Sequence, residues 1–151
     1  MRELKEGDKS PIFNGCNQNG NIISSESYSD KKLILFFYPK DNTPGCTKEA
    51  CNLRDNYELL MGKGFSIVGV SADDQLKHQK FIDKYSLPFP LIADVDKTVI
   101  NAFGCWGPKK FMGKEYDGIH RKTFIIESGV ITKIFHKVKT NDHTNQILNE
   151  L

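Results

Sequence analysis

The sequence predicts an α/β protein built on a mixed β-sheet. Two apolar runs, at 33–38 and 65–71, are each followed by an amphipathic helical segment. This alternation is typical of parallel strands joined by right-handed crossovers. Two further β-rich runs flank a short polar turn at 127–129, which predicts an antiparallel hairpin. Because the chain has no linker-like or repetitive segment, we expect residues 1–151 to form a single domain.

The first strands follow from turn chemistry and hydrophobicity. Residues 12–16 and 21–24 flank the dipeptide Asn19-Gly20, a strong turn signal, and so predict an N-terminal β-hairpin. A polar segment separates this hairpin from the run at 33–38. That run is continuously apolar, as in a strand that is covered on both faces. It ends at a proline, which cannot donate a hydrogen bond to a neighbouring strand.

The segment after this strand predicts a helix that ends at the Gly-Lys-Gly sequence 62–64. Thr43 is a typical N-cap, and Pro44 fits the first helical position, where its missing N–H is not needed. Cys46 is then the third helical residue. Together with Cys46, the apolar side chains of this helix form one stripe that faces the core: Ala50, Leu53, Tyr57 and Leu60.

The remaining elements follow from the same rules of periodicity and capping. In chain order we expect a strand at 65–71, a helix that begins after its cap Asp73 and ends before Pro88, a short strand at 89–93, a short helix at 96–103 capped by Asp96, strands at 122–126 and 130–138, and a final helix from Asp142 to Leu151. Residues 105–120 mix lysines with aromatic side chains. We interpret them as a solvated surface loop rather than a docking site for a partner protein.

The composition excludes several classes of protein. A net charge of +2 is too small to suggest a nucleic-acid-binding surface. No segment approaches the ~20 apolar residues of a transmembrane helix, and the charged N-terminus does not resemble a secretory signal. We therefore expect a cytoplasmic protein that binds neither nucleic acid nor membrane, with its four cysteines as free thiols.

The position of Cys46 indicates a reactive thiol. At the third helical position an anion meets unpaired backbone N–H groups and the positive end of the helix dipole. This field favours the thiolate, which is the nucleophilic form of cysteine. The alternative is a buried cysteine that acts as a small hydrophobic residue. Gly45 and the polar turn before it favour the reactive interpretation, because they open the backbone around the sulfur.

Cys51 lies five residues after Cys46 in the same predicted helix. Ideal helical geometry rotates the two residues by about 140° and separates their Cα atoms by about 8.7 Å. A disulfide tolerates a Cα separation of roughly 4.4–6.8 Å. The two cysteines can therefore be bridged only if the first turns of the helix unwind.

The residues around Cys46 resemble a known family. The pattern Pro39-x-x-x-Thr43-x-x-Cys46 is similar to the peroxidatic motif of peroxiredoxins. The longer string from Tyr38 to Cys51 resembles the bacterioferritin comigratory protein (PrxQ) subfamily. This resemblance implies a thioredoxin-like fold, a central mixed β-sheet flanked by helices, to which an N-terminal β-hairpin is added. It also implies a thiol-dependent peroxidase that reduces hydrogen peroxide and organic hydroperoxides.

The resemblance further implies a role for each residue of the motif. Cys46 would be the peroxidatic nucleophile, which peroxide oxidises to a sulfenic acid. The backbone N–H groups of Gly45 and Cys46 would hold the peroxide oxygens, and the Thr43 hydroxyl would hydrogen-bond the reacting atoms. Pro39 would cover the sulfur. Cys51 would be the resolving cysteine, which forms an intramolecular disulfide with Cys46.

A fixed positive charge is expected from a distant strand. The segment at 118–124 resembles the subfamily's G-x-x-R-x-T-F sequence, in which Arg121 is the matching arginine. An arginine at this position would otherwise be read as an ordinary surface charge. His120 and Lys122 are the alternatives if the register is shifted by one residue.

No cofactor or metal is expected, because the chain lacks the C-x-x-C and H-E-x-x-H patterns of zinc sites. The resemblance implies a peroxide substrate and thioredoxin, or a similar dithiol, as the reductant. Cys16 and Cys105 lack an evident activating group and are interpreted as structural. We expect a monomer, with a weak dimer as the alternative. A redox sensor or holdase that uses the same disulfide remains a second interpretation of these residues.

Overall fold

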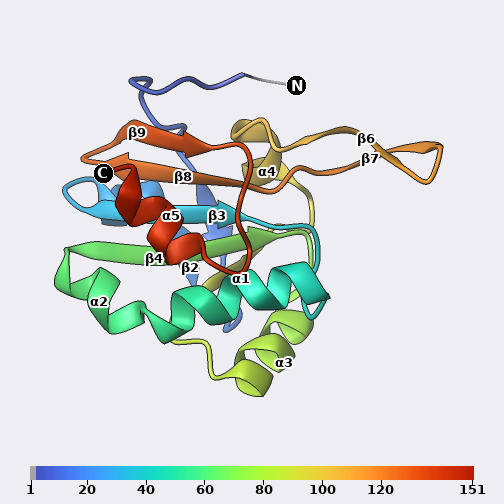
Figure 1. Ribbon diagram of the computed structural model, residues 1–151, viewed down its shortest axis with the longest axis horizontal. Helices are drawn as coiled ribbons and strands as arrows, with labels where there is room; N and C mark the ends of the chain where they lie inside the picture. The colour runs from blue at the N-terminus through green and yellow to red at the C-terminus, as the bar shows by residue number, and fades with distance from the viewer. Residues whose placement is uncertain (1–2) are drawn as a thin grey trace.

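The computed structural model describes residues 3–151, which are organised around a five-stranded mixed sheet with the strand order β5-β4-β3-β8-β9 (Figure 1). The first three strands of this order are parallel to one another, whereas β8 pairs antiparallel with β3, and β9 pairs antiparallel with β8. The strands are β3 (Lys32–Phe37), β4 (Phe65–Ser71), β5 (Leu91–Ala93), β8 (Lys122–Glu127) and β9 (Val130–Phe135). The predicted mixed sheet is thus confirmed.

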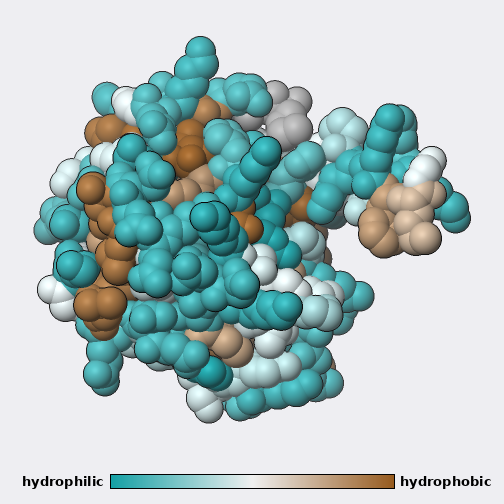
Figure 2. All heavy atoms as spheres, in the orientation of Figure 1, coloured by the Kyte–Doolittle hydropathy of each residue, from teal (hydrophilic) through white to brown (hydrophobic). Residues whose placement is uncertain are grey.

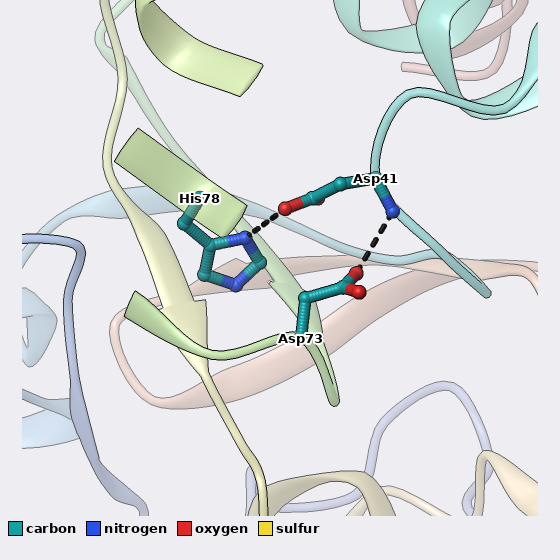
Figure 3. A group of neighbouring side chains, drawn as sticks. All are labelled: Asp41, Asp73 and His78. Atoms are coloured by element: carbon teal, nitrogen blue, oxygen red, sulfur yellow. Dashed lines mark hydrogen bonds and ion pairs between the residues drawn. The ribbon is translucent and has the colours of Figure 1, made fainter. Parts of the chain in front are cut away.

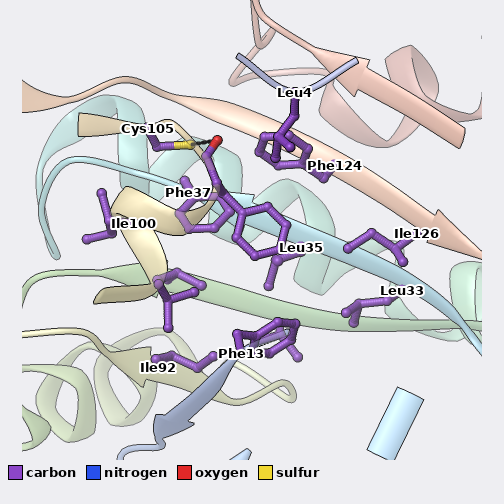
Figure 4. Close-up of a cluster of buried hydrophobic side chains, with 14 of the residues drawn as sticks. Leu4, Phe13, Leu33, Leu35, Phe37, Ile92, Ile100, Cys105, Phe124 and Ile126 are labelled. Carbon is purple, nitrogen blue, oxygen red and sulfur yellow. Dashed lines mark hydrogen bonds between the residues drawn. The ribbon is translucent and has the colours of Figure 1, made fainter. Parts of the chain in front are cut away.

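The core lies on both faces of the central strand β3. Because side chains alternate along a strand, Leu33, Leu35 and Phe37 enter the cluster drawn in Figure 4. Ile34 and Phe36 enter a second cluster on the opposite face. All of these side chains are buried, as expected of a strand in the middle of a covered sheet. Burial at this scale holds the carboxyl end of β3 in place, and the candidate site begins there.

The helices divide between the two faces of the sheet. Apolar residues of α1, α2, α3 and α5 belong to the second cluster, so these helices cover one face, while α4 and the N-terminal hairpin cover the other. The elements are β1 (Asn14–Cys16), β2 (Ile22–Ser24), a 3₁₀ turn (Ser25–Tyr28), α1 (Pro44–Asp55), α2 (Tyr57–Gly62), α3 (Gln75–Tyr85), α4 (Thr98–Ala102) and α5 (His143–Asn149). The antiparallel pairing of β1 with β2 confirms the predicted hairpin.

The single helix predicted from Pro44 to residue 61 is wrong, because the structure contains two helices separated at Asn56. The Asn56 side-chain amide donates to the backbone carbonyl of Asn52 at 2.9 Å. Asparagine competes in this way for the acceptor that the helical ladder would use. The Asn56 backbone N–H bonds to Arg54 O instead, and the chain leaves helical geometry for one residue.

The predicted surface loop at 105–120 is wrong as well. It forms an antiparallel hairpin of β6 (Trp106–Phe111) and β7 (Lys114–Ile119), which projects from the body of the protein (Figure 1). Met112 and Gly113 make the tight turn, both with positive φ. The exposed fractions are 66% for Phe111 and 88% for Met112, and an apolar patch stands out at the tip in Figure 2.

Two predicted helix N-caps are wrong. The N-cap of α3 is Asp74, whose side chain accepts from Lys77 N, while the predicted cap Asp73 is buried elsewhere. At α4 the N-cap residue is Lys97, although the predicted cap Asp96 does accept from Thr98 N at 3.1 Å. Both Asp94 oxygens also accept backbone N–H groups of the first turn. The sequence alone did not show which of several neighbouring aspartates would cap each helix. None of the helices within residues 3–151 has the length and hydrophobicity needed to cross a membrane.

Candidate active site

Cys46 lies in the first turn of α1, directly after the turn that follows β3. Its side chain is only 2% exposed. The first hydrogen bond of the helix runs from Thr47 N to Thr43 O at 2.8 Å. The backbone N–H groups of Gly45 and Cys46 precede this bond, so they point out of the helix end toward the region of the sulfur. The Thr43 hydroxyl donates to Lys40 O at 2.9 Å, which leaves its lone pairs available to a ligand.

Arg121 is the charged group that the fold brings to Cys46. It lies just before β8, and its Nη2 donates to Cys46 Sγ at 3.3 Å. The approach needs a small residue at position 45, because a Cβ atom there would lie 3.2 Å from Nη2. The two alternatives point elsewhere: His120 Nε2 lies 3.1 Å from Pro108 O, and Lys122 Nζ donates to Gly104 O at 3.5 Å.

Glu49 is a part of this site that the sequence analysis missed. Its Oε1 accepts from Arg121 Nη1 at 2.7 Å, while the residue as a whole is 0% exposed. Burial raises the pKa of the Glu49 carboxyl to about 7, although the Arg121 charge opposes the increase. Glu49 follows Cys46 by three residues on the same helix face, which is the signal that could have identified it.

The far side of Glu49 faces a histidine from the C-terminal helix. His143 Nε2 lies 3.6 Å from Glu49 Oε2 and 2.8 Å from Thr123 Oγ1. Burial lowers the pKa of His143 to about 4, so its ring is neutral at physiological pH. The guanidinium of Arg121 is therefore held between the sulfur of Cys46 and a buried carboxyl, and that carboxyl is backed by a neutral imidazole.

The other cysteines lie outside this arrangement. Cys51 is in the intact helix α1, where it is half-buried, and burial raises the pKa of its thiol. Cys105 is fully buried, which raises the pKa of its thiol to about 12. Cys16 lies in β1, which packs on the other face of the sheet. All four cysteines are free thiols.

A second cluster, Asp41, Asp73 and His78, fixes the turn that leads to Cys46 (Figure 3). Asp41 Oδ2 lies 2.6 Å from His78 Nδ1, and Asp41 N donates to Asp73 Oδ2 at 2.8 Å. Tyr38 completes the contacts of Asp41, because its hydroxyl donates to Oδ1 at 2.6 Å. These bonds join the turn to the end of β4 and to α3.

The donor atoms of this cluster lie within 4.8 Å of one another, as in a metal site. His78 is nevertheless committed on both sides, since its Nε2 lies 2.9 Å from Ile92 O and must donate to that carbonyl. Its Nδ1 is held by Asp41. A metal would have to break the bond between His78 and Asp41, so we interpret the cluster as a support for the turn.

Removing His78 should therefore destabilise the protein. We expect His78→Leu to lower the free energy of unfolding by about 3 kcal/mol, because it leaves a buried carboxylate at Asp41 without its partner. Urea denaturation followed by circular dichroism measures the change. His136→Leu, which alters an exposed histidine, is the matched control. Equal stability of the two variants would contradict this role of His78.

Comparison with known proteins decides the family. The model of the AhpC/TSA family matches residues 7–134. The chain belongs to the AhpC/TSA family. Peroxiredoxin Bcp of Escherichia coli K12 is 42% identical over 152 residues, covering 100% of this chain and 97% of that protein. Peroxiredoxin Bcp of Bacillus subtilis is 43% identical over 149 residues, covering 98% and 95%. The protein is accordingly a peroxiredoxin of the Bcp/PrxQ type, and a thiol peroxidase.

Solved structures agree with this assignment. A mutant of Xylella fastidiosa PrxQ superposes with a TM-score of 0.92 at 27% identity, covering 99% of this chain and 96% of that one. The Xanthomonas campestris bacterioferritin comigratory protein, described for its alkyl peroxide reduction activity, gives a TM-score of 0.86 at 28% identity, covering 95% and 96%. The predicted thioredoxin-like fold of this peroxiredoxin is thus confirmed.

Proposed function

We propose that this peroxiredoxin reduces hydrogen peroxide and organic hydroperoxides with Cys46 as the nucleophile. The observation that carries the proposal is the 3.3 Å contact between Arg121 Nη2 and Cys46 Sγ at the start of α1. A guanidinium and a helix N-terminus both favour the thiolate. The alkyl peroxide reduction of the X. campestris relative supports organic hydroperoxides as substrates.

In the chemical step, the thiolate of Cys46 attacks the terminal oxygen of the peroxide. An S–O bond forms as the O–O bond breaks, and negative charge moves from sulfur to the departing oxygen. The backbone N–H groups of Gly45 and Cys46 and the Arg121 guanidinium are placed to hydrogen-bond these oxygens. Donors that are fixed in place before the reaction stabilise the developing charge without reorganisation.

Thr43 and Pro39 complete the pocket in this proposal. The Thr43 hydroxyl already donates to Lys40 O, so it is oriented to accept a hydrogen bond from the peroxide O–H. Pro39 lies in the turn between β3 and α1. We propose that its ring limits the access of water to the sulfur. Both residues thus orient and shield the reacting atoms and undergo no chemical change themselves.

Cys51 is the proposed resolving cysteine. It shares α1 with Cys46, so the disulfide requires that the helix between them unwind. Cys105 is a poor competitor because burial keeps its thiol protonated. A thioredoxin-type dithiol then reduces the disulfide and returns the helix to its folded form. We propose that residues 1–151 do this as one domain, as a cytoplasmic monomer.

Replacing Cys51 tests the cycle. We expect Cys51→Ser to consume one equivalent of hydrogen peroxide at the normal rate but to lose steady-state turnover with thioredoxin and its reductase. The sulfenic acid at Cys46 would have no nearby thiol in this variant. Peptide mapping without reductant should find a Cys46–Cys51 link in the oxidised parent protein. Full turnover by the variant would mean that Cys16, Cys105 or an external thiol resolves the intermediate.

The same measurement separates an enzyme from a redox sensor or holdase. A sensor requires the disulfide only as a signal, so the parent protein would then form the link yet turn over slowly with a dithiol. Sustained peroxide consumption at a rate set by the supply of reductant supports the enzyme.

A further inference from the structure

One oxygen of the buried Glu49 carboxyl lacks a hydrogen-bond partner within residues 3–151. Oε1 accepts from Arg121, but Oε2 has no donor and is fully buried. A buried acceptor without a donor is destabilising by about 1–3 kcal/mol, more if it is charged, and is rare in folded proteins. Because this oxygen lies next to the candidate active site, its lack of a hydrogen-bond donor needs a chemical explanation.

The His143 ring nitrogen near this oxygen is an acceptor and not a donor. Gln146 Oε1 accepts from Lys139 N at 2.9 Å, and Gln146 Nε2 donates to Lys137 O at 2.7 Å, which fixes the orientation of the amide. His143 Nδ1 lies 2.8 Å from that same Oε1 and must therefore carry the ring proton. In the neutral ring, Nε2 is then the acceptor: the Thr123 hydroxyl donates to it at 2.8 Å, and Glu49 Oε2 lies 3.6 Å away.

A proton on Glu49 Oε2 would remove the buried charge from an oxygen that no donor reaches, and the resulting O–H would face the acceptor side of the His143 ring. We propose that Glu49 is a positioning residue that carries this proton while Cys46 is a thiolate and releases it when Cys46 is oxidised. Arg121 then faces one negative charge in either state, first on Cys46 and afterwards on Glu49. This inference rests on the proposed role of Cys46 as the peroxidatic nucleophile.

The charges around Glu49 agree with this exchange. Arg121 faces it from the start of β8, neutral His143 faces it from α5, and Cys46 lies on its own helix. Lys109 of β6 is close enough for its pKa to be affected by both Arg121 and Cys46, but burial lowers that pKa, and its Nζ is held by Ile119 O. A pKa of Glu49 near 7 allows the proton to be gained or lost at physiological pH.

A proton released by Glu49 changes the proton balance of the peroxide step. The thiolate forms an S–O bond with the terminal oxygen of ROOH, so that sulfur is oxidised, the O–O bond breaks, and RO⁻ departs. RO⁻ takes one proton from water to become ROH. Cys46 is now a neutral sulfenic acid, and Glu49 gives one proton to water as its carboxylate pairs with Arg121 alone. The two transfers cancel, so the step takes up no net proton.

Substitution of Glu49 by Gln isolates this effect. Gln Oε1 can accept from Arg121, and its uncharged amide N–H group takes the place of Oε2–H, so the variant reproduces the protonated carboxyl. It cannot release a proton. The experiment uses Cys51→Ser as the background, in order to stop the reaction at the sulfenic acid. Reduced protein is mixed with one equivalent of hydrogen peroxide in weak buffer slightly below neutral pH, with a pH-indicator dye.

With Glu49 present we expect proton uptake close to zero, and with Glu49→Gln close to one proton for each sulfenic acid formed. Glu115→Gln, the same change at an exposed glutamate, is the matched control and should behave as the parent does. Equal uptake with and without Glu49 would overturn the inference.

Sulfenic acid is quantified separately by dimedone trapping and mass spectrometry. Its absence would overturn the proposed role of Cys46, whereas its presence with unchanged proton uptake would overturn the role of Glu49 alone. Infrared difference spectra of the protein with Glu49 intact provide a second measurement, independent of whether the variant folds. The carbonyl band of a buried carboxylic acid should disappear on oxidation, and a spectrum without that loss would also overturn the inference.

Discussion

Replacing Cys46 by serine should abolish peroxide consumption. A serine hydroxyl stays protonated beside Arg121, because a fixed positive charge and a helix N-terminus cannot ionise so weak an acid at neutral pH. The serine oxygen also cannot form the sulfenic acid on which the cycle depends. We expect the initial rate of hydrogen peroxide loss, followed with a peroxide electrode, to fall to that of buffer. The fold should remain, since the side chains have similar size.

Cys16→Ser is the control for this prediction, because Cys16 lies in β1 on the other face of the sheet. It should retain full activity. Measurable peroxidase activity of Cys46→Ser would mean that the nucleophile has been misidentified.

Arg121→Met should slow the reaction with peroxide by roughly 10²–10³-fold, the usual effect of losing one preplaced donor to a developing oxyanion. The Arg121 guanidinium donates to Cys46 Sγ and also holds Glu49. Without it the thiolate loses its cation and the Glu49 carboxyl loses its counterion, so both groups should keep their protons. The rate can be followed by stopped flow through the emission of Trp106, the single tryptophan of the chain.

Lys122→Met is the matched control, since it removes a positive charge from the next residue, whose Nζ bonds to Gly104 O. It should leave the rate within a few-fold of the parent protein. If Lys122→Met were the slow variant and Arg121→Met the normal one, the register of the predicted arginine would be wrong. Circular dichroism establishes that each variant is folded.

The strands could be predicted because local patterns determine them. The apolar run of β3, the run of β4 and the turn between β8 and β9 each carry their own signal, and all three appear within one residue of the expected positions. Tertiary context decided the rest. The hairpin of β6 and β7 is mostly exposed, so its sequence lacks the alternation of apolar and polar residues that would predict a strand. The helix break at Asn56 depends on one side-chain bond that competes with the backbone.

The candidate site divides in the same way. The reactive position of Cys46 follows from its place after Thr43 and Pro44, which is local information. Glu49 becomes part of the site only through contacts in the folded protein with Arg121, 72 positions away, and with His143, 94 positions away. No local sequence pattern predicts such contacts. Arg121 was found through the family resemblance, because an arginine at a strand start is ordinarily a surface charge.

The break at Asn56 has a consequence for the redox potential of the protein. A disulfide that forms only in an unwound helix is less stable by the free energy that unwinding costs. Each backbone hydrogen bond given up costs about 0.5–1.5 kcal/mol, and every 1.4 kcal/mol raises the reduction potential by about 30 mV. Because α1 ends at Asp55, unwinding can stop there and leave α2 on the sheet. The break thereby limits how strongly oxidising the disulfide becomes, and so how readily a dithiol reduces it.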